Sequence, residues 1–220
     1  AAVGATTTVN WLVGSSIGAL SIGFLSYIAR ALGAGDGERA KRISAQAVLT
    51  VLIVGLISTV LTLSLSGLVP VWMKVDTAIR PDASAYFFIL YTPMLFRSAS
   101  IIFGTVLRAS GDTSTPMKIG ILVNVINIVF NFMLIYPTRP ILGGAIMMPG
   151  AGLGVIGAAI ASAISVAVGG ILISIILFRH PTVSPRGYKL RPDMQILAPC
   201  LKIAFPNMLQ RFGTSLGYVV

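Results

Sequence analysis

Three asparagine side chains recur at helical spacing inside one long apolar segment. Asn124, Asn127 and Asn131 stand at positions i, i+3 and i+7 of the stretch from Met117 to Tyr136. This spacing predicts three carboxamides on one face of a helix. Because an amide costs free energy in hydrocarbon unless it finds a partner, that face is expected to turn toward other helices or toward a water-filled cavity. Both a cavity-lining role and plain interhelical hydrogen bonding, at ~0.6 kcal/mol per pair, are compatible with the pattern.

One cation also lies well inside an apolar stretch. Arg97 follows Met94-Leu-Phe in the segment from Ala83 to Val106. A charged side chain at such a depth either marks a transport path or extends its charge toward the membrane surface. Arg97 is therefore a second candidate for a substrate or ion cavity.

Residues for catalysis are scarce. The chain has a single histidine, His180, in a basic loop, and a single cysteine, Cys200, in an apolar stretch. These cannot form a Cys/His metal cluster or an internal disulfide, and no nucleophile elbow is present. We therefore expect a protein that is not an enzyme and that carries no cofactor.

Long apolar helices are the elements that must position these side chains. The chain contains five long apolar stretches, and a sixth begins near Ile196. The five are residues 3–29, 45–72, 83–106, 117–136 and 152–178. Each is about long enough to cross a bilayer, which takes ~20 helical residues. The acidic residues all lie between or beside these stretches: Asp36, Glu38, Asp76, Asp82, Asp112 and Asp193.

The composition supports a membrane protein. The chain is 55% hydrophobic and 10% charged, with a mean hydropathy of +0.92, whereas ordinary globular domains have about 25% charged residues. Lipid leaves backbone amides without water, and no alternating strand pattern suggests a barrel. The sequence therefore predicts an all-α, polytopic transmembrane helical bundle.

Basic residues are distributed unevenly among the loops. The net charge is +10, but the cations are dispersed without interleaved aromatic residues, which disfavours nucleic-acid binding. The first, third and fifth loops carry ten Lys and Arg residues, and the second and fourth carry three. Because cytoplasmic loops are enriched in positive charge, the first, third and fifth loops are predicted to be cytoplasmic.

Four motifs together resemble the multidrug and toxic compound extrusion (MATE) transporters in order and spacing. They are ARALGAGD at 29–36, LRASGDTSTPM at 107–117, NVINIVFNFMLI at 124–135 and GVIGAAIAS at 154–162. The resemblance implies twelve helices in two six-helix lobes. Residues 1–192 would hold helices 2 to 6 of the N-terminal lobe, with its first helix missing, and residues 193–220 would begin helix 7 of the second lobe.

The same resemblance implies a function and a site. Members of this family export organic cations and amphipathic drugs or toxins by antiport against sodium ions or protons, through alternating access. The family's polar cluster falls on Asn127, Asn131 and Ser162, which are possible sodium ligands. Several members have an aspartate where this chain has Asn131, so the coupling carboxylate is expected outside this sequence. The implied partners are organic cations and the lipid bilayer, for a monomer in the plasma membrane of a prokaryote.

Two other functions are compatible with these residues. A lipid-linked oligosaccharide flippase of the same superfamily would need several inward cations to bind phosphate, and only Arg97 and Arg211 are available. A membrane scaffold that transports nothing would use closely packed helices, but three aligned asparagines would then serve packing alone. The sequence favours the exporter.

Overall fold

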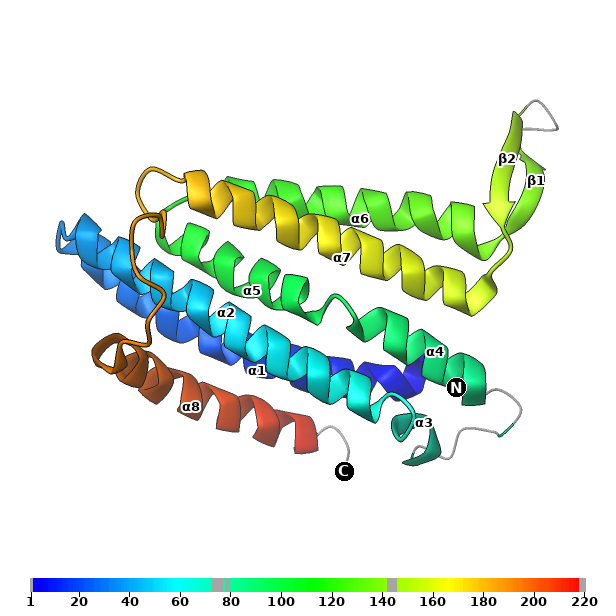
Figure 1. Ribbon diagram of the computed structural model, residues 1–220, viewed down its shortest axis with the longest axis horizontal. Coiled ribbons are helices and arrows are strands. Elements are labelled where there is room, and N and C mark those ends of the chain that lie inside the picture. Colours follow the sequence, from blue (N-terminus) through cyan, green and yellow to red (C-terminus); the bar gives the residue numbers. More distant parts are fainter. Residues whose placement is uncertain (1, 73–76, 78–79, 142–145, 218–220) are drawn as a thin grey trace.

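The computed structural model describes residues 2–72, 77, 80–141 and 146–217, so Asp76 lies outside the described residues, as does the side chain of Arg211. Long helices lie side by side in a bundle (Figure 1). The helices are α1 Ala2–Gly33, α2 Gly37–Leu65, α3 Val69–Trp72, α4 Arg80–Tyr91, α5 Met94–Ala109, α6 Ser114–Ile135, α7 Gly154–Arg179 and α8 Met194–Gly217.

The membrane spans agree with the apolar stretches of the sequence. Four helices are long and apolar enough to cross a bilayer, by length and composition: the Gly14–Gly33 part of α1, then α2, α6 and α7. A fifth span results if α4 and α5 count as one bent helix. The prediction of an all-α membrane bundle is confirmed.

The third predicted span is not one continuous helix. The chain bends by 41° between α4 and α5, at Thr92 and Pro93. Proline lacks a backbone N–H and its ring clashes with the carbonyl of the preceding turn, which breaks a helix. The backbone N–H and the hydroxyl of Thr92 both donate to the carbonyl oxygen of Phe88, at 3.0 and 2.8 Å, and so close the last turn of α4 before the bend. The predicted span over residues 83–106 is therefore formed by two helices with a bend between them.

A β-hairpin adds to the helical bundle. Strands β1 Pro137–Ile141 and β2 Ile146–Ala151 pair antiparallel between α6 and α7, with an irregular register between Pro137 and Arg139. The Thr138 hydroxyl bonds with the backbone of Gly150. The sequence predicted only a loop here, because the two proline-containing segments lack the alternating pattern of a strand.

The buried core lies mainly among α1, α2, α4 and α5, and α7 and α8 add further buried side chains. Its largest fully buried side chains include Phe24, Ile43, Phe87, Tyr91 and Ile102. By contrast α2 beyond Val51 and most of α6 expose aliphatic side chains, including Ile53, Leu56, Ile121 and Ile128. Exposed apolar faces on helices of this length are suited to lipid contact.

Glycine–aspartate turns join helices at one end of the bundle. Gly35 and Gly111 adopt positive φ angles of 76° and 92°, which favour glycine. Asp36 then accepts from the backbone N–H of Arg39 at 2.9 Å, and Asp112 accepts from that of Thr115 at 3.0 Å. Both turns and the α7–α8 connection lie at the same end of the bundle (Figure 1). Ten of the Lys and Arg residues lie in or beside these three connections.

Helix α8 packs along α1. The Cα of Gly23 has no room for a side chain, because an added Cβ would lie 2.4 Å from the carbonyl oxygen of Cys200. The predicted boundary between two lobes, at residues 192 and 193, falls one residue before α8 begins and stays a prediction.

Candidate functional site

Small residues bring α6 and α7 close together. A Cβ added at Gly157 would lie 2.5 Å from the carbonyl oxygen of Leu134, and one at Gly169 would lie 2.5 Å from Cγ2 of Val123. A larger side chain at Gly157 would require a shift of the helices, and one at Gly169 would have to displace the Val123 side chain. This close approach places polar side chains of the two helices within hydrogen-bonding distance.

A chain of hydrogen bonds links the two helices at mid-length. Asn131 Nδ2 donates to Asn127 Oδ1 at 2.9 Å, and Asn127 Nδ2 donates to Ser162 Oγ at 3.2 Å and to Ser165 Oγ at 3.4 Å. Ser165 in turn donates to the carbonyl oxygen of Ser162 at 3.0 Å. We call these four residues the α6–α7 network. All four side chains are half-buried or buried.

One oxygen of the α6–α7 network is left without a partner. Asn131 Oδ1 is buried and accepts no hydrogen bond from the part of the chain that the structure describes. The Asn131 amide is oriented with its NH2 group toward Asn127 Oδ1. Exchanging the O and N atoms of Asn131 would bring two oxygens together at that point. A buried acceptor without a donor costs about 1–3 kcal/mol, so the site is suited to a ligand that this oxygen can bind.

Asn124 does not join the network. Its side chain is exposed, and the contact position against α7 at that level is taken by Val123, which meets Gly169. The residues of α6 that face α7 at this level are 123, 127 and 131, which follow one another at intervals of four. The predicted set was 124, 127 and 131, with intervals of three and four. The prediction that all three carboxamides share one face toward the bundle is therefore corrected to two of them. A role for Asn124 in a cavity stays a prediction.

Arg97 lies apart from the network hydrogen bonds. It is half-buried in the first turn of α5, directly after the bend at Pro93. Its neighbour Phe96 packs against α7, where a Cβ added at Gly170 would lie 2.5 Å from the Phe96 carbonyl oxygen. The hydrogen bonds that link Asn127, Asn131 and the two serines do not include Arg97.

Ser165 was not predicted from the sequence. The residue is 2% exposed, and its hydroxyl accepts from Asn127 Nδ2 at 3.4 Å. A signal was present, because Ser165 follows Ser162 by three residues and so shares its face of α7. Among the described residues, no group of His, Cys, Asp or Glu side chains could hold a metal ion. The ligands that the network offers are neutral oxygens.

The fold and the site define an integral membrane bundle whose spanning helices are joined by a network of neutral polar side chains. Residues 1–133 match the MatE family, and the chain belongs to that family. The resemblance found in the sequence is thereby confirmed.

Relatives of known name and structure match nearly the whole chain. It is 27% identical over 218 residues to the probable multidrug resistance protein NorM of Thermotoga maritima, covering 99% of this chain and 45% of that protein. A solved outward-facing conformation of a multidrug resistance MATE family transporter of the MOP superfamily is 26% identical, with a TM-score of 0.85 over 99% of this chain and 46% of that one. An inward-facing conformation is 25% identical, with a TM-score of 0.81 over 98% and 46%. The chain spans about half the length of these relatives.

Proposed function

We propose that this chain forms one half of a secondary transporter that exports organic cations or amphipathic drugs and toxins by antiport against sodium ions or protons. Membership of the MatE family and the similarity to proteins named for multidrug resistance support this proposal. Similarity to both an outward-facing and an inward-facing structure supports alternating access.

The unpartnered oxygen of Asn131 is the observation that carries the proposal. Asn131 Oδ1, Asn127 Oδ1 and Ser162 Oγ are neutral oxygens held together between two spanning helices. Transporters commonly bind a coupling cation with such oxygens near the middle of the membrane. The network therefore supports a sodium site formed by Asn127, Asn131 and Ser162, with Ser165 as a further oxygen.

Proton coupling would need a different group. Carboxamides and hydroxyls do not change charge near neutral pH, whereas a buried carboxylate does. In the part of the chain that the structure describes, the acidic side chains lie in turns or in the first turn of a helix. If the transporter is driven by protons, its coupling carboxylate belongs to a segment beyond these helices.

The remaining features of the proposal follow from composition and charge. The three basic connections are proposed to face the cytoplasm, because positive charge accumulates there. The transporter is proposed to act as a monomer in the plasma membrane of a prokaryote. Its partners would be small organic cations and the lipid bilayer.

Transport by the full-length protein in proteoliposomes tests the proposal. A fluorescent organic cation is followed while a sodium gradient or a pH gradient is imposed separately. Movement driven by either gradient is the expected result and identifies the coupling ion. Absence of movement under both gradients, with correctly inserted protein, would contradict the exporter and direct the assay to lipid-linked oligosaccharides.

A pair of asparagine variants tests the site. Asn131→Leu is expected to lower the transport rate at least about tenfold, because an ion loses a ligand worth about 1.4 kcal/mol or more. Asn124→Leu makes the same change on the same helix outside the hydrogen-bonded network and is expected to have a smaller effect. Equal transport by wild type and Asn131→Leu, at equal expression, would remove the network from the mechanism.

A further inference from the structure

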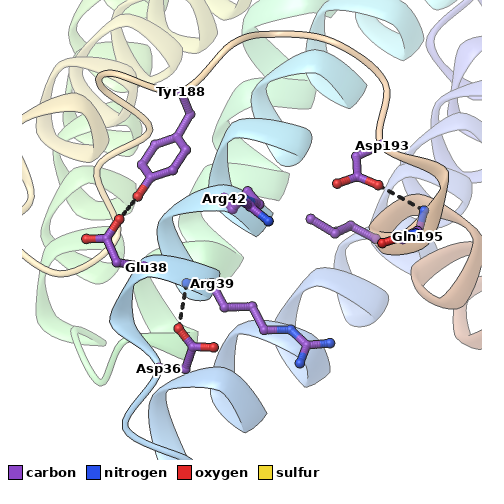
Figure 2. Close-up of a pocket in the computed structure, with 8 residues that line it drawn as sticks. Asp36, Glu38, Arg39, Arg42, Tyr188, Asp193 and Gln195 are labelled. Atoms are coloured by element: carbon purple, nitrogen blue, oxygen red, sulfur yellow. Dashed lines mark hydrogen bonds between the residues drawn. The ribbon is translucent and has the colours of Figure 1, made fainter.

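A charged cleft opens at the basic end of the bundle, away from the α6–α7 network. It lies between the α1–α2 turn, the start of α2 and the connection that leads to α8, and has a volume of about 500 Å³. We call it the linker cleft (Figure 2). Its lining residues are Asp36, Glu38, Arg39, Arg42, Tyr188, Asp193, Gln195 and Ile196. An adjoining depression shares Arg42, Tyr188 and Asp193 and adds Lys189 and Arg191.

The walls of the linker cleft are held by contacts between distant parts of the chain. Gln46 of α2 is 3% exposed, donates from Nε2 to the carbonyl oxygen of Arg191 at 2.8 Å, and accepts from the N–H of Asp193 at 3.1 Å. The Tyr188 hydroxyl donates to the carboxylate of Glu38. The connection is thus fixed to α2 on both sides of the cleft, so the cleft exists before any ligand binds.

The acidic side chains of the cleft already have partners. Asp36 accepts from the backbone N–H of Arg39, and Asp193 accepts from that of Gln195, as the dashed lines in Figure 2 show. Glu38 pairs with Lys41 at 3.2 Å as well as with Tyr188. These carboxylates are therefore engaged in local structure.

The two arginines that line the cleft differ from its carboxylates in their hydrogen bonding. Neither the Arg39 nor the Arg42 guanidinium forms a hydrogen bond or an ion pair within the described ranges of the chain. Figure 2 shows Arg42 in the middle of the cleft, between Tyr188 and Gln195. The linings of the cleft and of the adjoining depression together have four Lys and Arg side chains against three carboxylates, and guanidinium groups bind phosphate through paired, charge-assisted hydrogen bonds.

We propose that the linker cleft binds the phosphate group of an anionic phospholipid. The surface of α2 provides a place for the acyl chains. Ile53 and Leu56 follow Arg42 by eleven and fourteen residues, on the same face of the helix, and are 48% and 55% exposed. Ile53 lies about 16 Å further along the helix axis. A lipid with its phosphate at Arg42 can therefore lay its chains on an exposed apolar strip, which a soluble phosphate compound cannot use.

Binding of defined lipids to the full-length protein tests this inference independently of transport. The purified protein is titrated with phosphatidylglycerol, and binding is measured by native mass spectrometry. Replacing both arginines, Arg39→Gln with Arg42→Gln, is expected to weaken phosphatidylglycerol binding about thirtyfold. The control replaces two other exposed cations at the same end, Arg179→Gln with Arg186→Gln, which do not line the linker cleft.

The two double variants have the same net charge, so they separate a site from a general electrostatic effect. The control is expected to change binding less than about twofold, because its cations lie outside the cleft. Equal losses in the two variants would overturn the inference. Binding of sn-glycerol 3-phosphate as tight as that of phosphatidylglycerol would also overturn it, in favour of a soluble phosphate ligand. The unfolding temperatures of both variants confirm that the fold is retained.

Discussion

The α6–α7 network and the linker cleft join distant segments with different chemistry. The network consists of amides and hydroxyls between two spanning helices. The cleft contains arginines, carboxylates and a tyrosine at the end of the bundle. An ionised side chain in the apolar interior is costly without a counter-charge, whereas at the end of a bundle water solvates it. The depth of each region therefore determines which polar groups it can hold.

The two regions also achieve close contact in different ways. In the network, Gly157 and Gly169 remove side chains so that the helices approach each other. In the cleft, one long side chain, Gln46, spans the gap and bonds to the backbone of the connection. The α6–α7 network therefore depends on glycines that have no side chain, and the linker cleft depends on the side-chain amide of Gln46. Substitutions can test each dependence separately.

The largest effect on stability is expected from enlarging Gly157. In Gly157→Ala the new Cβ meets the backbone of Leu134, which cannot move aside as a side chain can. The free energy of unfolding of the detergent-solubilised full-length protein is expected to fall by about 3 kcal/mol. Gly18→Ala is the matched control, since a Cβ there has no atom of the described chain within 4 Å. Similar losses in both variants would contradict close packing as the basis of the network.

The next largest effect is expected from removing the amide of Gln46. Gln46→Ala leaves the Arg191 carbonyl and the Asp193 N–H without their partner, at a cost of about 2 kcal/mol. The local consequence is measured by trypsin cleavage after Lys189, which should become faster as the connection opens. Gln195→Ala removes an exposed amide from the same cleft and should leave cleavage unchanged. Unaltered cleavage in Gln46→Ala would show that the connection is held by other contacts.

A smaller effect on stability is expected at Asn131. Asn131→Leu loses one amide contact within α6, to Asn127, and should change the free energy of unfolding by only about 0.5 kcal/mol. The same variant is expected to impair transport strongly, because the unpartnered oxygen is lost. Unfolding and transport are therefore measured on one preparation. Parallel losses of both would indicate that the network serves packing alone.

The smallest effect is expected in the pH dependence of stability, through Asp112 in the turn between α5 and α6. The side-chain and backbone hydrogen bonds from Thr115 hold the pKa of Asp112 below its ordinary value. Because the folded pKa is the lower one, the stabilisation is present at neutral pH and is lost as the pH falls below about 4. The unfolding temperatures of wild type and Asp112→Asn should differ slightly at pH 7 and converge at about pH 3. A difference that persists at low pH would exclude this carboxylate as the cause.

The sequence predicted the spans because hydrocarbon imposes a minimum length on apolar helices. It also identified Asn127, Asn131 and Ser162, the last through the resemblance to a family. It did not predict the bend at Pro93, since proline is tolerated in membrane helices when neighbours supply partners. Nor did it identify Gln46, whose partners lie 145 and 147 residues away along the chain. Contacts between residues so far apart produce no recognisable pattern in a short stretch of sequence.

The bend between α4 and α5 has a consequence for biogenesis. Neither helix, at 12 and 16 residues, reaches the length that an insertion machinery recognises as a span, and α5 carries Arg97 in its first turn. The two must therefore enter the bilayer as one segment. Helix α4 packs on α7, which is synthesised later. The contacts between α4 and α7 can form only after α7 has been inserted, so the packing of this segment is completed by a part of the chain that is synthesised after it.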